Sequence, residues 1–335
     1  MKRIHLSKDT ACMVRGLLIA ALKRQIDSGC KIPWLSRWAV PPMNVEHCKP
    51  YRGLNGFLLA LHSIDFEAPF YMTFVQIKKF GFRLKYNEKE AKRKDGTVYI
   101  KRIYPSPVPV VKAIAKYIHN EELITQEQYD TLSEEEREKV LLKFTNKVFF
   151  EWNICQTNMD EMNREVYDQY VAIANDIERS SCDVDSSSPV LDYITQTEGA
   201  WVCPIIFDQL HKCLYMVKEH EIHLVAREAF CKSSSYYGAL LHEMCHSVYK
   251  RNGKSENHAY EECVVEISSA ILMWQIGMEK TIDKEHIGYV QSWIEYLYDD
   301  KTLDRIINNV MVIVNIVTKH LNNIQVTITK KQLTA

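Results

Sequence analysis

The spacing of apolar residues divides the amino-terminal part of the chain into helices and an irregular segment. Residues 8–28 carry apolar side chains at helical spacing, which predicts an opening helix. Residues 32–55 are instead rich in Pro, Gly, Asn and aromatic residues, which is typical of a loop. A short helix is expected over residues 56–64. Another is expected to begin at Thr73, because Gln76 stands at the capping-box position.

Beyond this point the pattern alternates between strands and helices. Strand composition is found at residues 82–86, 97–104, 147–152, 213–217 and 221–226. Helical spacing is found over residues 120–144, over residues 158–180 and after Ser233. Asp95-Gly96 indicates a hairpin between the first two strands. The order predicts an α+β protein: a small basic α+β domain over residues 1–157, then a mainly helical domain with a short sheet over residues 158–335.

The composition is that of a globular protein, but the charge is divided unevenly. Of 335 residues, 46% are hydrophobic and 25% are charged, which excludes a disordered chain or a coiled coil. Residues 1–120 hold 22 Lys and Arg against 8 Asp and Glu, a balance of +14, and the other 215 residues carry −15. This asymmetry suggests that the amino-terminal end binds a polyanion. The charges could equally attract the two halves to each other or form solvated surfaces.

The cysteines and apolar runs point to a protein of the cytoplasm. None of the ten cysteines forms a C-x-x-C pair, so a cysteine zinc ribbon is not expected. The apolar runs near the amino terminus and near residue 310 are too short to span a membrane, and no cleavage site for a signal peptide follows the first. We therefore expect a cytoplasmic protein with reduced thiols and no membrane contact.

The most specific chemical signal is His242-Glu243-x-x-His246, within a segment of helical spacing. On a helix the two histidines lie one turn apart on the same face, so both imidazoles can reach one zinc ion at about 2.0–2.1 Å. Glu243 lies beside them and would accept a proton from water at the metal. The motif predicts a zinc site with Glu243 as its catalytic residue.

A second helical pattern supplies further carboxylates. Glu262 and Glu266 are one turn apart and share a face. One of them can complete a His, His, Glu ligand set, while the other accepts the free N–H of a ligating histidine. Alternatively, these are polar residues facing the core of a helical bundle. Burying two histidines and three carboxylates without a metal would be costly, which favours the metal site.

The amino-terminal half shows no comparable catalytic set, but it combines positive charge with aromatic residues in a Pro-rich loop. Basic side chains follow phosphates, and aromatic rings stack on unpaired bases, so single-stranded DNA would suit this half. We expect Trp34 and Tyr51 to stack, with Trp38 in reserve, and Lys49 and Arg52 to contact phosphates. Each aromatic residue taken singly could equally belong to the core.

With both halves considered, the chain resembles the antirestriction proteins of the ArdC type, whose genes travel on plasmids and other mobile elements. In the first half the resemblance rests on Pro33-Trp34, Asn44, Tyr51-Arg52-Gly53-x-Asn55, Thr73-Phe74-x-Gln76, Gly81 and Asn153-x-x-Gln156. In the second half it rests on Tyr236-Tyr237, Leu241-His242-Glu243-x-x-His246 and Tyr260-x-Glu262-x-x-x-Glu266. The chain departs from the family at His47-Cys48, which replaces Thr-Gly, in an insertion over residues 112–144, and in lacking a Pro after Val225.

The resemblance implies an amino-terminal domain that binds incoming single-stranded DNA and protects it from host restriction, with Asn55 among the DNA-binding residues. It also implies a zincin-like metallopeptidase domain. There Glu262 is the third zinc ligand, and Glu266 orients a ligating histidine. A host restriction protein or another protein could be the target of this domain.

Two other interpretations remain open. The protein could be an intracellular zinc peptidase whose basic domain only recruits substrate, or the zincin fold could be a structural support without turnover. Salt-sensitive binding of single strands would distinguish an antirestriction protein from the first. Peptide hydrolysis that depends on Glu243 would eliminate the second.

Overall fold

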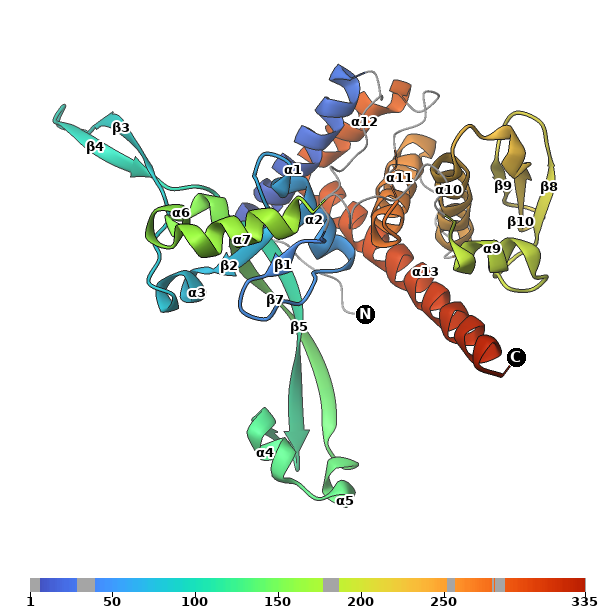
Figure 1. Ribbon diagram of the computed structural model, residues 1–335, viewed down its shortest axis with the longest axis horizontal. Coiled ribbons are helices and arrows are strands. Elements are labelled where there is room, and N and C mark those ends of the chain that lie inside the picture. Colours follow the sequence, from blue (N-terminus) through green and yellow to red (C-terminus); the bar gives the residue numbers. More distant parts are fainter. Residues whose placement is uncertain are drawn as a thin grey trace.

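The amino-terminal half is built around a mixed sheet (Figure 1). The computed structural model describes residues 7–28, 40–176, 187–251, 257–278, 280 and 287–334. Five strands follow the order β1-β2-β7-β5-β6, in which β1 and β2 are parallel and the other neighbours are antiparallel. The strands are β1 (Met43–Asn44), β2 (Phe70–Thr73), β5 (Val108–His119), β6 (Glu122–Ile124) and β7 (Leu141–Asn153).

Short helices flank this sheet, and local signals set where several of them begin. Ser7 caps the first helix, and Thr73 forms a complete capping box with Gln76. The helices are α1 (Lys8–Asp27), α2 (Gly53–Ser63), α3 (Phe74–Lys79), α4 (Gln126–Thr131), α5 (Glu134–Arg137), α6 (Met159–Met162) and α7 (Arg164–Ala174), with a 3-10 turn at Ile154–Gln156. Tyr167 of α7 packs with Phe70 and Met72 of β2 in a small hydrophobic cluster.

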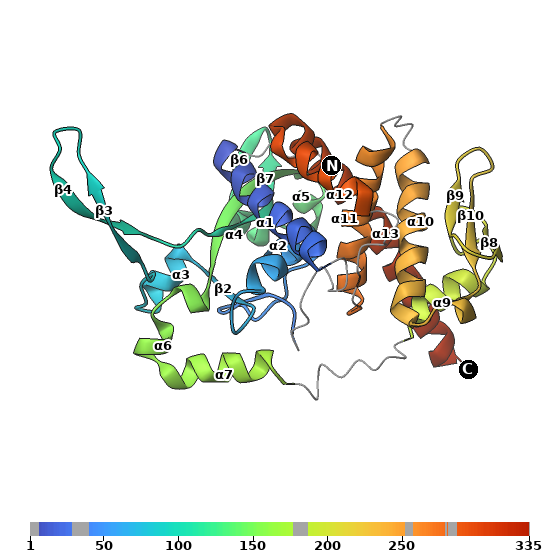
Figure 2. The same cartoon turned by 90° about the horizontal axis from the view of Figure 1, so that it is seen from above.

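Two antiparallel arms extend from this half. The first, the β3–β4 ribbon, consists of β3 (Asn87–Lys92) and β4 (Val98–Ile103), and it projects from the body in both views (Figures 1 and 2). Its turn contains Gly96 at φ +87°, a backbone conformation that favours glycine. The second, the β5–β7 arm, is the outer part of β5 and β7 and carries α4 and α5 at its tip (Figure 1), where β6 pairs with the end of β5.

The carboxyl-terminal half places a three-stranded sheet beside a group of long helices. The sheet order is β8-β10-β9, with β8 parallel and β9 antiparallel to β10. Its strands are β8 (Ile205–Gln209), β9 (Leu214–Met216) and β10 (Glu221–Val225). The helices are α9 (Pro189–Gln196), α10 (Ser233–Arg251), α11 (His258–Gln275), α12 (Ile287–Tyr298) and α13 (Asp300–Thr334), with a 3-10 turn at Arg227–Ala229.

One hydrophobic core joins the two halves. α1 and α2 pack against helices α11, α12 and α13, and their buried residues belong to one cluster with those of the carboxyl-terminal helices. Gly56 of α2 marks a close approach, because a Cβ atom there would lie 2.4 Å from the ring of Trp274 on α11. The division at residue 157 stays a prediction. Side-chain packing places α7 with the amino-terminal half.

The α+β fold class is confirmed, as are the opening helix and the hairpin at Asp95-Gly96. The helix predicted over residues 120–144 is wrong. Only α4 and α5 form there, because the residues from Leu141 onward pair with β5. The strand predicted over residues 82–86 is also wrong, since the ladder begins at Asn87. Within the described residues, no helix has the length and apolar character needed to cross a membrane.

Candidate metal centre and candidate DNA-binding residues

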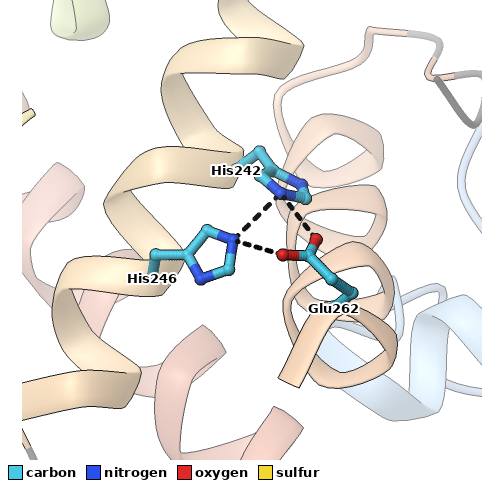
Figure 3. A group of neighbouring side chains, drawn as sticks. All are labelled: His242, His246 and Glu262. Atoms are coloured by element: carbon cyan, nitrogen blue, oxygen red, sulfur yellow. Dashed lines mark hydrogen bonds and ion pairs between the residues drawn. The ribbon is translucent and has the colours of Figure 1, made fainter. Parts of the chain in front are cut away.

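The candidate metal ligands lie on two helices that pack side by side, α10 and α11 (Figure 3). On α10 the apolar residues around the motif, among them Leu241 and Met244, are fully buried and hold the helix in the shared core. His242 and His246 project from α10 towards Glu262 on α11. All three side chains are buried, with exposed fractions of 4–9%.

Three ligand atoms converge between these helices. The Nε2 atoms of His242 and His246 are 3.1 Å apart; the first lies 3.3 Å from Oε2 of Glu262 and the second 3.3 Å from Oε1. Two atoms bound to one zinc ion at about 2.0–2.1 Å in tetrahedral geometry are roughly 3.3 Å apart, so the spacing fits a metal site. Among the described residues, no other group of His, Cys, Asp and Glu side chains converges in this way.

The other ring nitrogen of each histidine faces its own carboxylate. Nδ1 of His242 lies 3.1 Å from Glu266 Oε2, and Nδ1 of His246 lies 2.8 Å from Glu261 Oε1. In a neutral imidazole, Nδ1 then donates a hydrogen bond to the carboxylate, and Nε2 keeps a lone pair directed at the other histidine. Two lone pairs facing each other at 3.1 Å repel unless a proton or a metal ion lies between them, and the donor set of two imidazoles and one carboxylate suits zinc.

Each of these carboxylates also meets a lysine. Lys280 Nζ lies 2.6 Å from Glu266 Oε2, and Lys250 Nζ lies 2.5 Å from Glu261 Oε2. Lys280 also donates to the hydroxyl of Ser269, at 2.7 Å. The sequence indicated Glu266 but not Glu261 or the two lysines. The adjacency of Glu261 to Glu262 was the one available signal, whereas Lys280 follows α11 and carries no motif.

The electrostatics of the site favour a bound cation. Burial lowers the pKa of His246, but its hydrogen bonds with Glu261 and Glu262 outweigh burial and raise that pKa to about 10. The pKa of His242 is also raised, because Glu262 and Glu266 outweigh burial. Burial acts to raise the pKa of Glu266, but Lys280 and His242 bring it down to about 2. The site therefore attracts positive charge, either a proton or a metal ion.

Glu243 is buried on α10, directly after His242, and its charge is close enough to raise the pKa of His246. It is not one of the three residues whose ligand atoms converge. His258 stands at the start of α11 with its Nδ1 3.6 Å from Glu262 Oε1, and its side chain is 67% exposed. Glu243 is thus placed at the site without coordinating the candidate metal position.

The structure divides the predicted DNA-binding residues into three groups. Trp34 and Trp38 lie outside the described residues. Lys49 and Arg52 are exposed, as phosphate contacts would need to be. Tyr51 and Asn55 take part in the fold itself. The amide of Asn55 exchanges two hydrogen bonds with the backbone of Val111, at 2.7 and 2.9 Å, which tie α2 to β5.

A buried polar network connects several of the amino-terminal motif residues. Glu151 on β7 is fully buried and accepts hydrogen bonds from the Tyr51 hydroxyl at 2.6 Å and the Asn44 amide at 3.3 Å. Asn44 and Gln76 exchange two further hydrogen bonds, at 3.0 and 2.9 Å. Burial raises the pKa of Glu151, and the Tyr51 hydroxyl and Lys112 oppose that rise. Sequence reasoning missed Glu151, because its partners lie 100 and 107 residues away along the chain.

The fold and the metal centre define a protein with two recognisable parts. Residues 203–307 match the family model of a zincin-like metallopeptidase. Residues 14–149 match the model of the N-terminal domain of the anti-restriction factor ArdC. The chain thus joins a domain of the family of ArdC amino-terminal domains to a zincin-like metallopeptidase domain.

Solved structures agree with this fold. The chain is similar to the antirestriction ArdC protein from plasmid R388, in a metal-free crystal structure and in a Mn(II)-bound one, each with a TM-score of 0.56. The metal-free structure is 19% identical in sequence, and the match covers 92% of this chain and 97% of that chain. For the Mn(II)-bound structure the values are 20%, 93% and 98%. No curated protein matches the chain.

Proposed function

We propose that this protein binds single-stranded DNA through its amino-terminal half, holds one zinc ion in its carboxyl-terminal half, and protects incoming mobile-element DNA from host restriction in the cytoplasm. One observation carries the proposal: the match to the ArdC amino-terminal domain, over residues 14–149, includes most of the strongly basic residues 1–120. Basic side chains that neutralise phosphates give binding without sequence preference, which suits a protein that meets any incoming strand.

His242, His246 and Glu262 would hold the metal, because their ligand atoms already lie at the distances of a tetrahedral site. A bound zinc ion would supply Lewis acidity at this position. Glu243 would accept and release a proton beside it, and Glu261 and Glu266 would hold the two imidazoles in one orientation. These roles make peptide hydrolysis the chemistry that the site could perform.

The first test measures DNA binding by the complete chain, because α1 and α2 share their core with the carboxyl-terminal half. We expect tighter binding of a single strand than of a blunt duplex, and a log affinity that falls by about 0.7 per contacted phosphate against log salt. Trp34→Ala should weaken binding by about 1–3 kcal/mol if one base stacks there. Arg52→Ala should instead reduce the salt slope by about 0.7. Equal affinity for duplex and single strand, or a flat salt response, would refute the DNA assignment.

The main alternative is a zinc peptidase whose basic half only recruits substrate, and the buried Glu243 next to His242 favours it. Glu243→Gln should leave zinc content, folding and strand binding unchanged while removing any peptidase activity. If the variant kept its fold but lost strand binding, the two functions would not be separate. If wild-type protein hydrolysed peptides but bound no DNA, the peptidase interpretation would replace ours.

A further inference from the structure

The β3–β4 ribbon is the most exposed element of the amino-terminal half. It extends away from the body in both views, on the side opposite α10 (Figures 1 and 2). Apart from Ala91, every residue of its two strands is exposed to solvent. A two-stranded ribbon that buries so little is marginally stable by itself, so its protruding form calls for a partner that it contacts.

The charge of the ribbon indicates the chemistry of that partner. Residues 78–104 contain ten Lys and Arg against three Asp and Glu, a balance of +7, which is half of the excess carried by residues 1–120. Within the described residues, several ribbon cations form no ion pair, namely Lys89, Lys92, Arg93, Lys94 and Lys101. The partner is therefore a polyanion.

One pair of residues on the ribbon shows directly why an anionic partner would stabilise it. Lys89 and Lys101 are Cα partners across the ladder, so their side chains stand next to each other on one face. Like charges directly opposite each other destabilise a strand pair, and an anion between them removes that cost. Lys92 and Arg102 lie on the other face, where Glu88 and Glu90 accompany them. The ribbon thus presents cations on both of its faces.

Apolar and aromatic side chains accompany these cations. Val98 is 53% exposed, Ile100 55% and Tyr104 52%. Arg102 lies over the ring of Tyr86, at 4.6 Å from the ring centroid. Cations on both faces, with apolar groups between them, suit a setting with a phosphate wall on each side. A groove of duplex DNA is such a setting, and the major groove is wide enough to admit a two-stranded β-ribbon. A single strand would occupy one face only.

We propose that the β3–β4 ribbon is an arm that enters a groove of duplex DNA next to the bound single strand, with Lys89 and Lys101 on one phosphate wall. This inference rests on the proposed single-strand binding and adds a second contact, so the preferred ligand is a duplex with a single-stranded tail. The contact is independent of sequence, because it is made with phosphates.

The experiment compares three probes: a single strand, a blunt duplex and a duplex with a single-stranded tail. The test variant is Lys89→Gln/Lys101→Gln in the complete chain. We expect wild-type protein to bind the tailed duplex tightest. In the variant, the salt slope on that probe should fall by about 1.8, at about 0.9 for each of two lost duplex phosphate contacts. Binding of the single strand should not change.

The β5–β7 arm provides a matched control. Lys116 and Lys143 are also directly opposite each other and exposed, but the tip of that arm, residues 120–138, has eight acidic residues and one basic. We expect Lys116→Gln/Lys143→Gln to bind all three probes as wild type does. The circular dichroism spectrum of the ribbon variant should match wild type, and its unfolding midpoint should be equal or slightly higher, because the substitution removes a repulsive pair.

Three results would overturn the arm. In the first, the ribbon variant keeps the wild-type salt slope on the tailed duplex. In the second, the ribbon variant and the control variant lose the same affinity for the tailed duplex. In the third, the ribbon variant loses as much affinity for the single strand as for the tailed duplex. If the wild-type protein still bound the single strand, the proposed function would stand in each of these cases. If wild-type protein bound none of the three probes, the proposed function would fall together with the arm.

Discussion

His242 and His246 illustrate how single residues are arranged around the metal centre. Each histidine has a carboxylate at Nδ1, and each of those carboxylates has a lysine. Four carboxylates (Glu243, Glu261, Glu262 and Glu266) and two lysines (Lys250 and Lys280) leave a charge of −2 when the histidines are neutral, which one divalent cation balances. The motif spacing predicted that the two candidate ligands on α10 converge, because i and i+4 positions of a helix share a face. It could not predict Lys280, which only the fold brings to Glu266.

This arrangement predicts that Glu261 and Glu266 have similar roles. Glu261→Gln and Glu266→Gln should each weaken zinc binding by about 10–100-fold, because each removes the negative charge behind one ligating imidazole. Competition titration against a chelator would measure the affinities, with the exposed Glu165→Gln on α7 as the unaffected control. If Glu262→Ala kept full zinc content while Glu266→Ala lost it, the roles assigned to Glu262 and Glu266 would have to be exchanged.

Tyr51 provides a second prediction for a single residue, since its hydroxyl donates to the buried Glu151. Tyr51→Phe should lower the free energy of unfolding by about 1.5–3 kcal/mol, the contribution of a hydrogen bond to a charged group. The ring remains, so single-strand affinity should not change if Tyr51 stacks on a base.

The pH dependence of this effect follows from Glu151. Tyr51 opposes the rise in the pKa of Glu151, so the variant should have a still higher folded-state pKa for this carboxyl. The loss in free energy of unfolding caused by Tyr51→Phe should be complete at a pH above the folded-state pKa of Glu151 in both wild type and variant. It should shrink as pH falls and Glu151 becomes protonated. Tyr104→Phe, at an exposed position, is the matched control. Urea unfolding at several pH values would measure both variants, and a deficit that grew on acidification would contradict this account.

Local signals and long-range pairing contribute differently to the elements. Ser133 with Glu136 does form a capping box, as the sequence predicts, and α5 begins directly after it. That helix has only four residues, because the segment that follows pairs with β5 as β7. Asp95-Gly96 predicts its hairpin correctly, since both strands lie next to the turn in sequence. Turns and helix caps can therefore be predicted from the local sequence, whereas the length of a strand depends on a partner strand far along the chain.

The way in which whole helices pack together was even harder to predict from the sequence. Helical spacing predicted α1 and the helices after Ser233, but their apolar faces do not state which helix covers which. In the structure α1 and α2 contribute to the same hydrophobic core as α10 and α11, on which the candidate metal ligands lie. An ion pair between Arg15 of α1 and Asp300 of α13 crosses this contact, so part of the charge asymmetry acts within the molecule.

At the scale of the whole molecule, a shared core predicts that the two halves unfold together. Gly56→Ala tests this, because the added Cβ would lie 2.4 Å from the Trp274 ring and would push α2 away from α11. We expect a loss of about 1–3 kcal/mol, typical of overpacking, in a single transition. Gly16→Ala is the matched control: Gly16 lies in α1, and among the described residues no atom beyond its neighbours in that helix lies within 4 Å of the new Cβ. Removing a helical glycine there should increase stability by about 0.4–1 kcal/mol. Urea unfolding followed by circular dichroism and tryptophan fluorescence would measure both variants. Two separate transitions, of which Gly56→Ala shifts only one, would show that the halves are independent domains.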